Sequence, residues 1–227
     1  ASMVSAGYTV VVPDYEGPNM RWTIGKESAH AALDGIRAAQ RFLRAPASTP
    51  VGLYGYSGGS IPTGFGAELA PSYAPELNLV GATAGGVLVN PANNLAYVNG
   101  TTRWSAVIPA LMSVYDETYG IGIEKYLSPK GVQVLGDIRG ECINNFLGKY
   151  PNLTDSSLLL PQYPSLLDVP GIPAAIKANA EARLNGTVLM FNGVSGTLGD
   201  GGFTGWASVD VASNKPLVKL DLDFQRI

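Results

Sequence analysis

One pentapeptide, Gly55-Tyr56-Ser57-Gly58-Gly59, carries the residue types that nucleophilic catalysis needs. It fits the pattern G-x-S-x-G, in which a serine stands on a sharp turn between a strand and a helix. Such a turn strains the serine backbone, and small residues at Gly55 and Gly59 are expected to let the strand and the helix pack closely. We therefore expect Ser57 to face a pocket, with the backbone N–H of Gly58 donating to an oxyanion.

The residues on either side of the pentapeptide supply the structural context that the motif requires. A buried strand is expected from Val51, and a helix over Ser60 to Leu69, with Pro62 in a first turn that tolerates proline. Because the chain contains 28 glycines, a structural tight turn is the alternative interpretation. The strand before Ser57 and the helix after it favour the nucleophile.

The sequence contains a single histidine, His30, which is therefore a candidate general base. It lies in Glu27 to Leu43, where apolar residues recur on one helical face. A helix that precedes the nucleophile strand packs on the face of the sheet, whereas the base is expected at the edge that carries Ser57, later in the chain. We interpret His30 as a structural residue of this helix.

Two carboxylates follow the first β-branched run. Tyr8 to Pro13, with the sequence YTVVVP, predicts a strand buried on both faces, and Asp14 and Glu16 come directly after it. Either could be a catalytic acid at a strand end. Because acidic residues beside a turn glycine are ordinary loop chemistry, we favour loop carboxylates that hydrogen-bond the turn.

Two further carboxylates lie downstream of the serine. Gly186 to Gly193 predicts a buried strand, and Asp200 sits on the glycine-rich loop after it, where the acid belongs in the chain order Ser, Asp, His. An aspartate in a plain turn fits the same spacing, so both interpretations stay open at this point. Asp210 is a weaker candidate, expected on a following helix.

Composition bounds the class of protein. The chain has 227 residues, of which 46% are apolar and 15% charged, so one α/β domain with a sizeable core is expected. A net charge of −3 and a pI near 5.1 do not favour binding to nucleic acid or to anionic membranes. Since no run of about 18 apolar residues exists, no transmembrane segment is expected.

The single cysteine, the N-glycosylation sequons and the first residues bear on whether the protein is secreted. Cys142 is the only cysteine, which rules out an internal disulfide framework and a cysteine metal site. We expect no metal and no cofactor. Asn99, Asn152 and Asn185 each begin an N-glycosylation sequon, as in surface loops of secreted proteins. The first residues do not resemble a signal peptide, although a processed or truncated start would have the same appearance.

The order of expected elements predicts an α/β fold with parallel strands. A further strand is expected over 79–86, and the core is assigned to residues 1–92 and 183–227. Residues 93–182 predict a helical, proline-punctuated insertion beside the nucleophile, where a lid would be built; a purely structural cap is the alternative. The remaining expected elements are helices over 106–119, 123–127, 131–145 and 174–184, and a final strand over 215–224.

Four blocks in this order resemble a known family: VVVPDYEGP, ALDGIRAAQRF, LYGYSGGS and SYAPELNLVGATAGG. From Gly7 to about Val211 the chain resembles the fungal and actinobacterial secretory lipases. The resemblance implies an α/β-hydrolase fold with a helical lid, secretion, and action on triacylglycerols and other long-chain esters. Position by position, it implies that Ser57 is the nucleophile, Gly58 the oxyanion-hole amide and Asp200 the triad acid.

The sequence also departs from that family's pattern. The family's triad histidine follows the next strand, and no residue here matches it; an acidic oxyanion-hole residue and a cysteine that would pair with Cys142 belong to strands ahead of Ala1. We therefore expect these 227 residues to be a central segment of a longer secreted lipase. Without a base, the segment alone should be nearly silent as a catalyst.

Three hypotheses for the function follow. The first is a lipase that cleaves esters through an acyl-enzyme on Ser57, with a lipid or ester substrate at an interface. The second is a non-catalytic hydrolase-fold scaffold that binds apolar ligands, and the third is acyl transfer from the same serine to an alcohol. We expect a monomer without a nucleic-acid partner.

Overall fold

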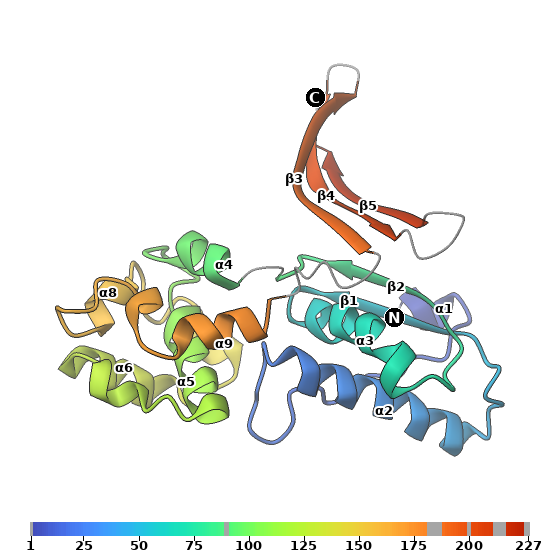
Figure 1. The fold of residues 1–227 in the computed structure, drawn as a ribbon, viewed down its shortest axis with the longest axis horizontal. Coiled ribbons are helices and arrows are strands. Elements are labelled where there is room, and N and C mark those ends of the chain that lie inside the picture. Colours follow the sequence, from blue (N-terminus) through green and yellow to red (C-terminus); the bar gives the residue numbers. More distant parts are fainter. Residues whose placement is uncertain (1, 89–90, 181–187, 199–200, 211–216, 225–227) are drawn as a thin grey trace. The chain divides into compact units, whose positions relative to one another are not determined.

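The computed structural model describes residues 2–88, 91–180, 188–198, 201–210 and 217–224. The chain divides into two compact units, Ala1–Glu181 and Ala182–Ile227, and each is defined by itself (Figure 1). The elements, in chain order, are α1 (Ser2–Ser5), α2 (Gly25–Leu43), β1 (Val51–Tyr56), η1 (Ser57–Gly59), α3 (Ser60–Tyr73), β2 (Leu79–Gly85), α4 (Pro91–Val98), α5 (Val107–Tyr119), η2 (Ile123–Tyr126), α6 (Pro129–Ile138), α7 (Ile143–Phe146), α8 (Asp155–Leu158), η3 (Leu166–Asp168), α9 (Ile172–Ala178), β3 (Val188–Leu198), β4 (Gly201–Asp210) and β5 (Leu217–Phe224).

A parallel β1–α3–β2 unit forms the part of the first unit that carries the pentapeptide. The two strands pair in register from Val51 opposite Leu79 to Tyr56 opposite Gly85. α3 contacts both strands, and α2 packs against α3 (Figure 1). The predicted parallel pairing is therefore confirmed, and it brings the carboxyl ends of β1 and β2 to the same edge.

The sheet of the first unit is covered on one face. Leu53 and Gly55 face α3, whereas Tyr54, Tyr56 and Val80 are 69%, 73% and 65% exposed. Successive side chains of a strand point to opposite faces, so one covering helix buries only alternate residues. The expected buried strand at β1 is therefore buried on one face only.

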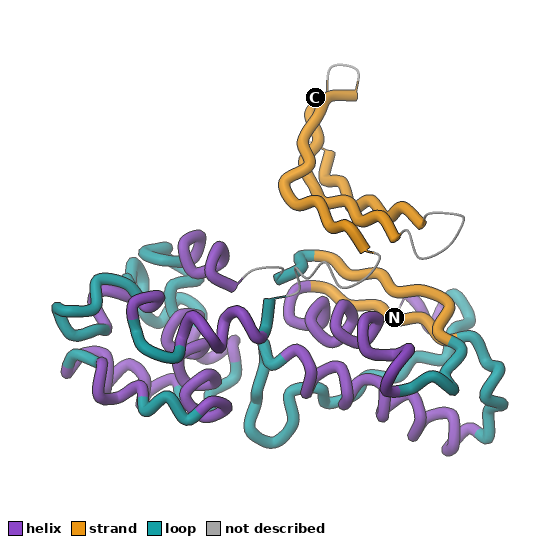
Figure 2. Tube along the Cα trace, in the orientation of Figure 1, coloured by secondary structure: helices purple, strands orange, loops and turns teal. Residues whose placement is uncertain are grey.

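The run Tyr8–Pro13 does not form the predicted buried strand (Figure 2). Tyr8 is 66% and Val12 86% exposed. A β-branched run favours an extended backbone, but a strand needs a neighbouring backbone to pair with, and none of the described residues pairs with this run in a ladder. Its end packs on α2, since a Cβ on Gly35 would lie 2.9 Å from the Pro13 side chain.

The predicted insertion is helical (Figure 2). It also has its own apolar core. The helices from α4 to α9 share the largest cluster of buried apolar residues in the described part of the chain. Its fully buried members include Ile108, Met112, Ile123, Leu158 and Ile172. A body of helices that buries its own apolar surface is expected to be stable without strands.

Two helices of the insertion differ from their predicted bounds. The helix expected over 131–145 is two helices, α6 and α7, because Gly140 between them has a φ of +79°, which an α-helix cannot contain. The helix expected over 174–184 begins earlier, at Ile172, and α9 ends at Ala178.

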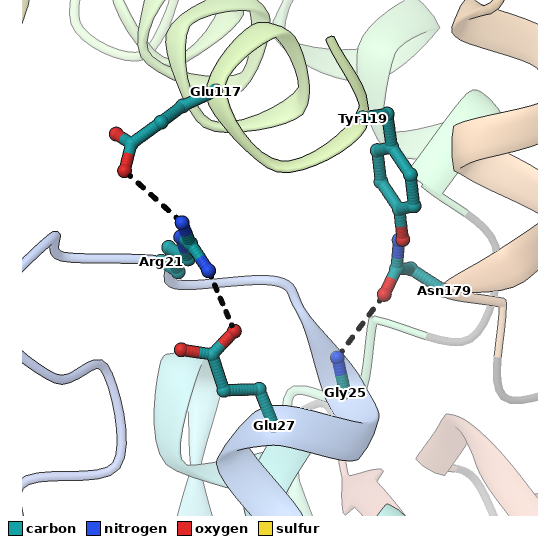
Figure 3. A network of polar contacts seen from close by, with 6 residues as sticks. All are labelled: Arg21, Gly25, Glu27, Glu117, Tyr119 and Asn179. Carbon is teal, nitrogen blue, oxygen red and sulfur yellow. Dashed lines mark hydrogen bonds and ion pairs between the residues drawn. The ribbon is translucent and has the colours of Figure 1, made fainter.

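Asn179 fixes the end of the insertion to the start of α2 (Figure 3). The N-cap residue of α2 is Ile24, whose side chain makes no hydrogen bond to the helix. The Oδ1 atom of Asn179 accepts from the Gly25 N–H at 3.1 Å, and its Nδ2 donates to the Tyr119 hydroxyl at 2.7 Å. A buried amide from a distant segment thus provides the cap that the local sequence lacks.

Arg21 makes a second connection between α2 and the insertion (Figure 3). Its guanidinium lies 3.3 Å from Glu27 on α2 and 3.3 Å from Glu117 on α5. Ile24, next to this bridge, belongs to the apolar core of the insertion rather than to the core beneath the sheet. The start of α2 is therefore a shared support for the sheet and for the helical insertion.

The second unit is an antiparallel sheet in the order β3–β4–β5. Val188 pairs with Asp210, and Asp210 in turn with Leu217. Asp210 therefore ends a strand, and the prediction of a helix there is wrong because residues 201–210 have a ladder partner on each side. That residues 183–227 join 1–92 in one core stays a prediction, since the structure defines each unit only by itself.

The turn from β1 into α3 depends on one of its two outer glycines. A Cβ on Gly55 would lie 1.9 Å from the carbonyl oxygen of Gly59 and 2.4 Å from the Thr63 hydroxyl, which itself donates to Gly59 at 2.9 Å. A Cβ on Gly59 would meet no atom of the described residues within 4 Å. The expected need for a small residue is confirmed at Gly55 and wrong at Gly59, which has ordinary helical dihedrals.

We expect Gly55→Ala to lower the free energy of unfolding by about 3 kcal/mol, because the added methyl overlaps backbone atoms that cannot move aside. The matched substitution Gly59→Ala, in the same pentapeptide, should change it by less than about 1 kcal/mol. Urea unfolding followed by circular dichroism measures both. Equal losses for the two variants would contradict the packing described above.

For the cap, we expect Asn179→Ala to lower the free energy of unfolding by about 1–3 kcal/mol, since the buried Gly25 N–H loses its acceptor and the partly exposed Tyr119 hydroxyl loses its donor. Asn94→Ala, at an exposed position on α4, is the control and should be neutral. Thermal melts of the two variants give the comparison. An Asn179→Ala protein as stable as the control would show that the amide does not anchor the insertion.

Candidate active site

Ser57 has the strained backbone that the motif predicts. Its φ is +54°, in the left-handed region that non-glycine residues seldom occupy, and it is the first residue of η1. The residue is exposed and stands at the carboxyl end of β1. Strain of this kind costs about 1–3 kcal/mol and persists only where the surroundings impose it, which here are the close packing at Gly55 and the helix that follows.

The start of α3 provides hydrogen-bond donors beside Ser57. The buried Ser60 hydroxyl donates to the Ser57 carbonyl at 2.6 Å and holds the turn. The first N–H groups of a helix have no acceptor within the helix, and the positive end of the 14-residue α3 lies at the same place. Gly58, in η1 directly before α3, lies beside Ser57 at this end, and its role as the oxyanion-hole amide stays a prediction.

Gly86 closes the other side of the strand-to-helix turn at residues 55–59, which we call the elbow. The sequence did not lead us to expect this contact. Its φ is +60°, and a Cβ there would lie 3.4 Å from the Ser57 nitrogen and 3.6 Å from the Tyr56 ring. The sequence feature that could have predicted this contact is the pair Gly85-Gly86 at the end of the second parallel strand, because the carboxyl ends of parallel strands meet at one edge.

The loop after Pro13 brings a phenol to the same edge. The Tyr15 hydroxyl lies 3.5 Å from the place that a Cβ on Gly58 would take. Partial burial, and after it the charge of Glu16, raises the pKa of the Tyr15 phenol; partial burial, and after it the charge of Asp14, raises the pKa of Glu16. Asp14 accepts from the Gly17 N–H at 3.2 Å, which is the turn role that we favoured for it.

His30 lies at the far end of α3 from Ser57. Its ring stacks on Tyr73, the last residue of α3, with 4.1 Å between ring centroids. At 1.5 Å per residue, the 13 steps from Ser60 to Tyr73 separate the two ends of this helix by about 20 Å. His30 is thus a packing residue between α2 and α3, beside the Asp34–Arg37 ion pair.

Two residues singled out from the sequence, Asp200 and Asn185, lie outside the described residues. Ser57 and Gly58 are brought together at one edge, whereas the role of Asp200 stays a prediction. Cys142, at the N-terminus of α7, is exposed and free.

No cluster of metal-binding side chains accompanies the elbow: within the described ranges, no three His, Cys, Asp or Glu side chains are grouped so that they could hold an ion. In the same ranges, no helix has the length and apolarity needed to cross a membrane. A shallow hollow lies at the amino ends of the strands, away from Ser57, and is lined by Arg37, Arg41, Arg44 and Glu76, among others.

Comparison with known sequences places this site in a family. The family model described as secretory lipase matches residues 1–195, a range that includes the elbow and ends before Asp200. The chain is 37% identical to secreted triacylglycerol lipase LIP3 of Malassezia restricta over 155 residues, which cover 66% of this chain and 33% of that protein. It is 38% identical to lipase A of Moesziomyces aphidis over 157 residues, 67% of this chain and 34% of that one. The chain therefore spans about a third of the length of these relatives.

Solved structures give the same result for the fold. Candida antarctica lipase A superposes with a TM-score of 0.72 at 34% identity, over 81% of this chain and 44% of that one. Its closed state superposes with a TM-score of 0.69 at the same identity, over 78% and 42%. This likeness confirms the predicted α/β-hydrolase class. With the serine elbow at the end of β1 and a family match over residues 1–195, the chain belongs to the secretory lipase family.

Proposed function

We propose that Ser57 is the nucleophile of a secreted lipase that hydrolyses triacylglycerols and other long-chain carboxylic esters. The observation that carries the proposal is the serine at φ +54° between β1 and α3 in a chain of the secretory lipase family. Relatives that are named as secreted triacylglycerol lipases support both the substrate class and the extracellular location.

The reaction would proceed through an acyl-enzyme. The Ser57 oxygen forms a bond to the ester carbonyl carbon and gives its proton to a base, while the carbonyl electron pair moves onto the oxygen. The Gly58 N–H, in η1 directly before α3, would stabilise that oxyanion. Collapse of the intermediate expels the alcohol, which takes the proton from the base, and water then releases the fatty acid from Ser57 by the same steps.

The base must be a group other than His30. That ring stacks at the opposite end of α3, about 20 Å from the elbow by helix rise, and it is the only histidine among the 227 residues. The proposal therefore assigns the base to a part of the protein outside this sequence, and Asp200 to the acid that would orient it. Removal of the serine or the histidine of such a triad lowers kcat about a million-fold in the subtilisin case.

A non-catalytic scaffold is the second candidate, and the remote position of His30 is the observation that favours it. In that case the exposed edge at Ser57 would bind apolar ligands without turnover, and replacement of the serine hydroxyl would leave binding unchanged. Acyl transfer to an alcohol uses the same elbow and differs only in the acceptor, so analysis of the products distinguishes it from hydrolysis.

We further propose that α4 to α9 form a cap beside the acyl site, in the position that we expected for a lid. Gly86, against Ser57, is followed within five residues by Pro91, where α4 begins, so the insertion starts beside the elbow. Its other end is held at the start of α2 by Asn179 and, through Glu117, by Arg21 (Figure 3).

For the nucleophile, we expect a fluorophosphonate probe applied to the full-length gene product to modify Ser57, since it reacts with activated serines. Ser57→Ala should abolish both labelling and hydrolysis of a long-chain p-nitrophenyl ester. Ser72→Ala, at an exposed position near the other end of α3, should change neither. Mass spectrometry of the labelled peptide identifies the site; a label on another residue, or turnover by Ser57→Ala, would overturn the proposal.

We also propose Asn152 as an N-glycan acceptor and exclude Asn99. The exposed Asn152 has a φ of +60°, and its Oδ1 accepts weakly from Thr102 at 3.4 Å, which leaves its amide nitrogen free among the described residues. The Asn99 Nδ2 donates to the buried Asp155 at 3.0 Å, and its Oδ1 accepts from the Asp155 N–H at 2.9 Å. A sugar on Asn99 would have to displace this pair.

Secretion from a glycosylating fungal host tests this assignment. After enzymatic deglycosylation, which converts the acceptor asparagine to aspartate, peptide mapping should find the conversion at Asn152 and not at Asn99. Asn152→Gln should remove that glycan at unchanged stability, whereas Asn99→Gln should lower the melting temperature and leave the glycan in place. A glycan on Asn99 with Asn152 unmodified would reverse the assignment.

A further inference from the structure

The Tyr15 hydroxyl lies beside the amide that the proposed mechanism uses. A Cβ on Gly58 would be 3.5 Å from the Tyr15 oxygen. A Cβ is about 2.5 Å from its own backbone nitrogen, so the phenol oxygen lies within about 6 Å of the Gly58 nitrogen. Two donors that each lie about 2.9 Å from one shared oxygen can be up to about 6 Å apart. The two groups are therefore close enough to bind the same oxygen atom.

The loop that carries Tyr15 is held on both sides. Before it, Pro13 packs against Gly35 of α2, and Asp14 accepts from the Gly17 N–H. After it, the Glu16 carbonyl accepts from the Arg21 N–H at 2.9 Å. Arg21 is itself fixed by ion pairs to α2 and α5 (Figure 3). Little ordering of this loop is then required when a substrate binds.

The Tyr15 hydroxyl has a hydrogen to donate and makes no hydrogen bond within the described residues. Partial burial and the neighbouring carboxylate of Glu16 both disfavour the phenolate and raise the pKa of Tyr15 above its usual value of 10.0. The phenol therefore stays protonated throughout the neutral range. A half-buried donor at the edge that carries the nucleophile is available to a ligand.

We propose that the Tyr15 hydroxyl is a further donor to the oxyanion that forms when Ser57 attacks an ester carbonyl, beside the Gly58 N–H. This role rests on the proposed function of Ser57. As the bond from the Ser57 oxygen to the carbonyl carbon forms, the carbonyl electron pair moves to the oxygen, and the hydrogen bond from Tyr15 strengthens with that charge. Tyr15 keeps its proton throughout, and no bond to it forms or breaks.

The test is Tyr15→Phe in the full-length gene product, which removes the donor and keeps the ring. Loss of one oxyanion donor costs about 10²- to 10³-fold in kcat in a protease. For a phenol on a loop we expect kcat for a long-chain p-nitrophenyl ester to fall about 10- to 100-fold, with KM within about twofold of the wild-type value. A long-chain trifluoromethyl ketone, which forms a tetrahedral oxyanion on the serine, should lose affinity by the same factor as kcat/KM.

Tyr8→Phe, which removes an exposed phenol from the preceding segment, is the matched control and should leave all three quantities unchanged. The melting temperature of Tyr15→Phe should stay within about 2 °C of the wild type, because the hydroxyl makes no intramolecular hydrogen bond. An unchanged kcat, or a raised KM with unchanged affinity for the ketone, would overturn the role in the oxyanion site. A wild-type protein that neither turns over ester nor labels at Ser57 would instead overturn the proposed function, and this role with it.

Discussion

The site depends on how closely β1 and α3 approach one another. The backbone of Gly55 lies so near the Gly59 carbonyl and the Thr63 hydroxyl that no side chain fits between them. A chain that must reverse in so little space has few allowed dihedrals, and Ser57 takes the left-handed conformation that results. The same turn raises the serine above the strand end and starts the helix directly beside it. Strain, exposure and the nearby amides therefore have a single cause.

The parallel topology brings the end of β2 to this edge, and the packing of the loop after Pro13 adds Tyr15. Because β1 and β2 run in the same direction, the residues that follow each strand meet at one end of the sheet. Gly86 approaches the Ser57 backbone from the end of β2, and Tyr15 approaches Gly58 from the loop that follows Pro13. A family that keeps this arrangement can vary the strand-end loops while the elbow stays the same.

The start of α2 has a comparable role on a larger scale. The local sequence gives this helix an isoleucine at its N-cap, which cannot accept a hydrogen bond from the first turn. Asn179, more than 150 positions away in the chain, supplies the acceptor instead, and the ion pairs of Arg21 add a second connection (Figure 3). The insertion, which has a core of its own, is thereby joined to the half of the molecule that carries the serine.

The sequence by itself determined the features that arise from local physics. The glycines around Ser57, the strand before it and the amphipathic pattern of α2 specified the elbow, its parallel strands and the structural character of His30. The local pattern predicted the wrong secondary structure where pairing with another backbone segment decides whether a strand forms. Tyr8–Pro13 has the composition of a buried strand but no backbone pairs with it among the described residues, and Asp210 ends a strand because β3 and β5 flank β4.

Tertiary structure alone decided which distant residues meet. Neither the approach of Tyr15 to Gly58 nor the cap that Asn179 provides is written in any local pattern, since each joins segments whose separation along the chain is set only by packing. Packing also distinguished two glycines that look equivalent in the motif. Gly55 is enclosed by backbone, whereas no described residue lies within 4 Å of a Cβ on Gly59, because a strand buries alternate residues while the first turn of a helix leaves one side free.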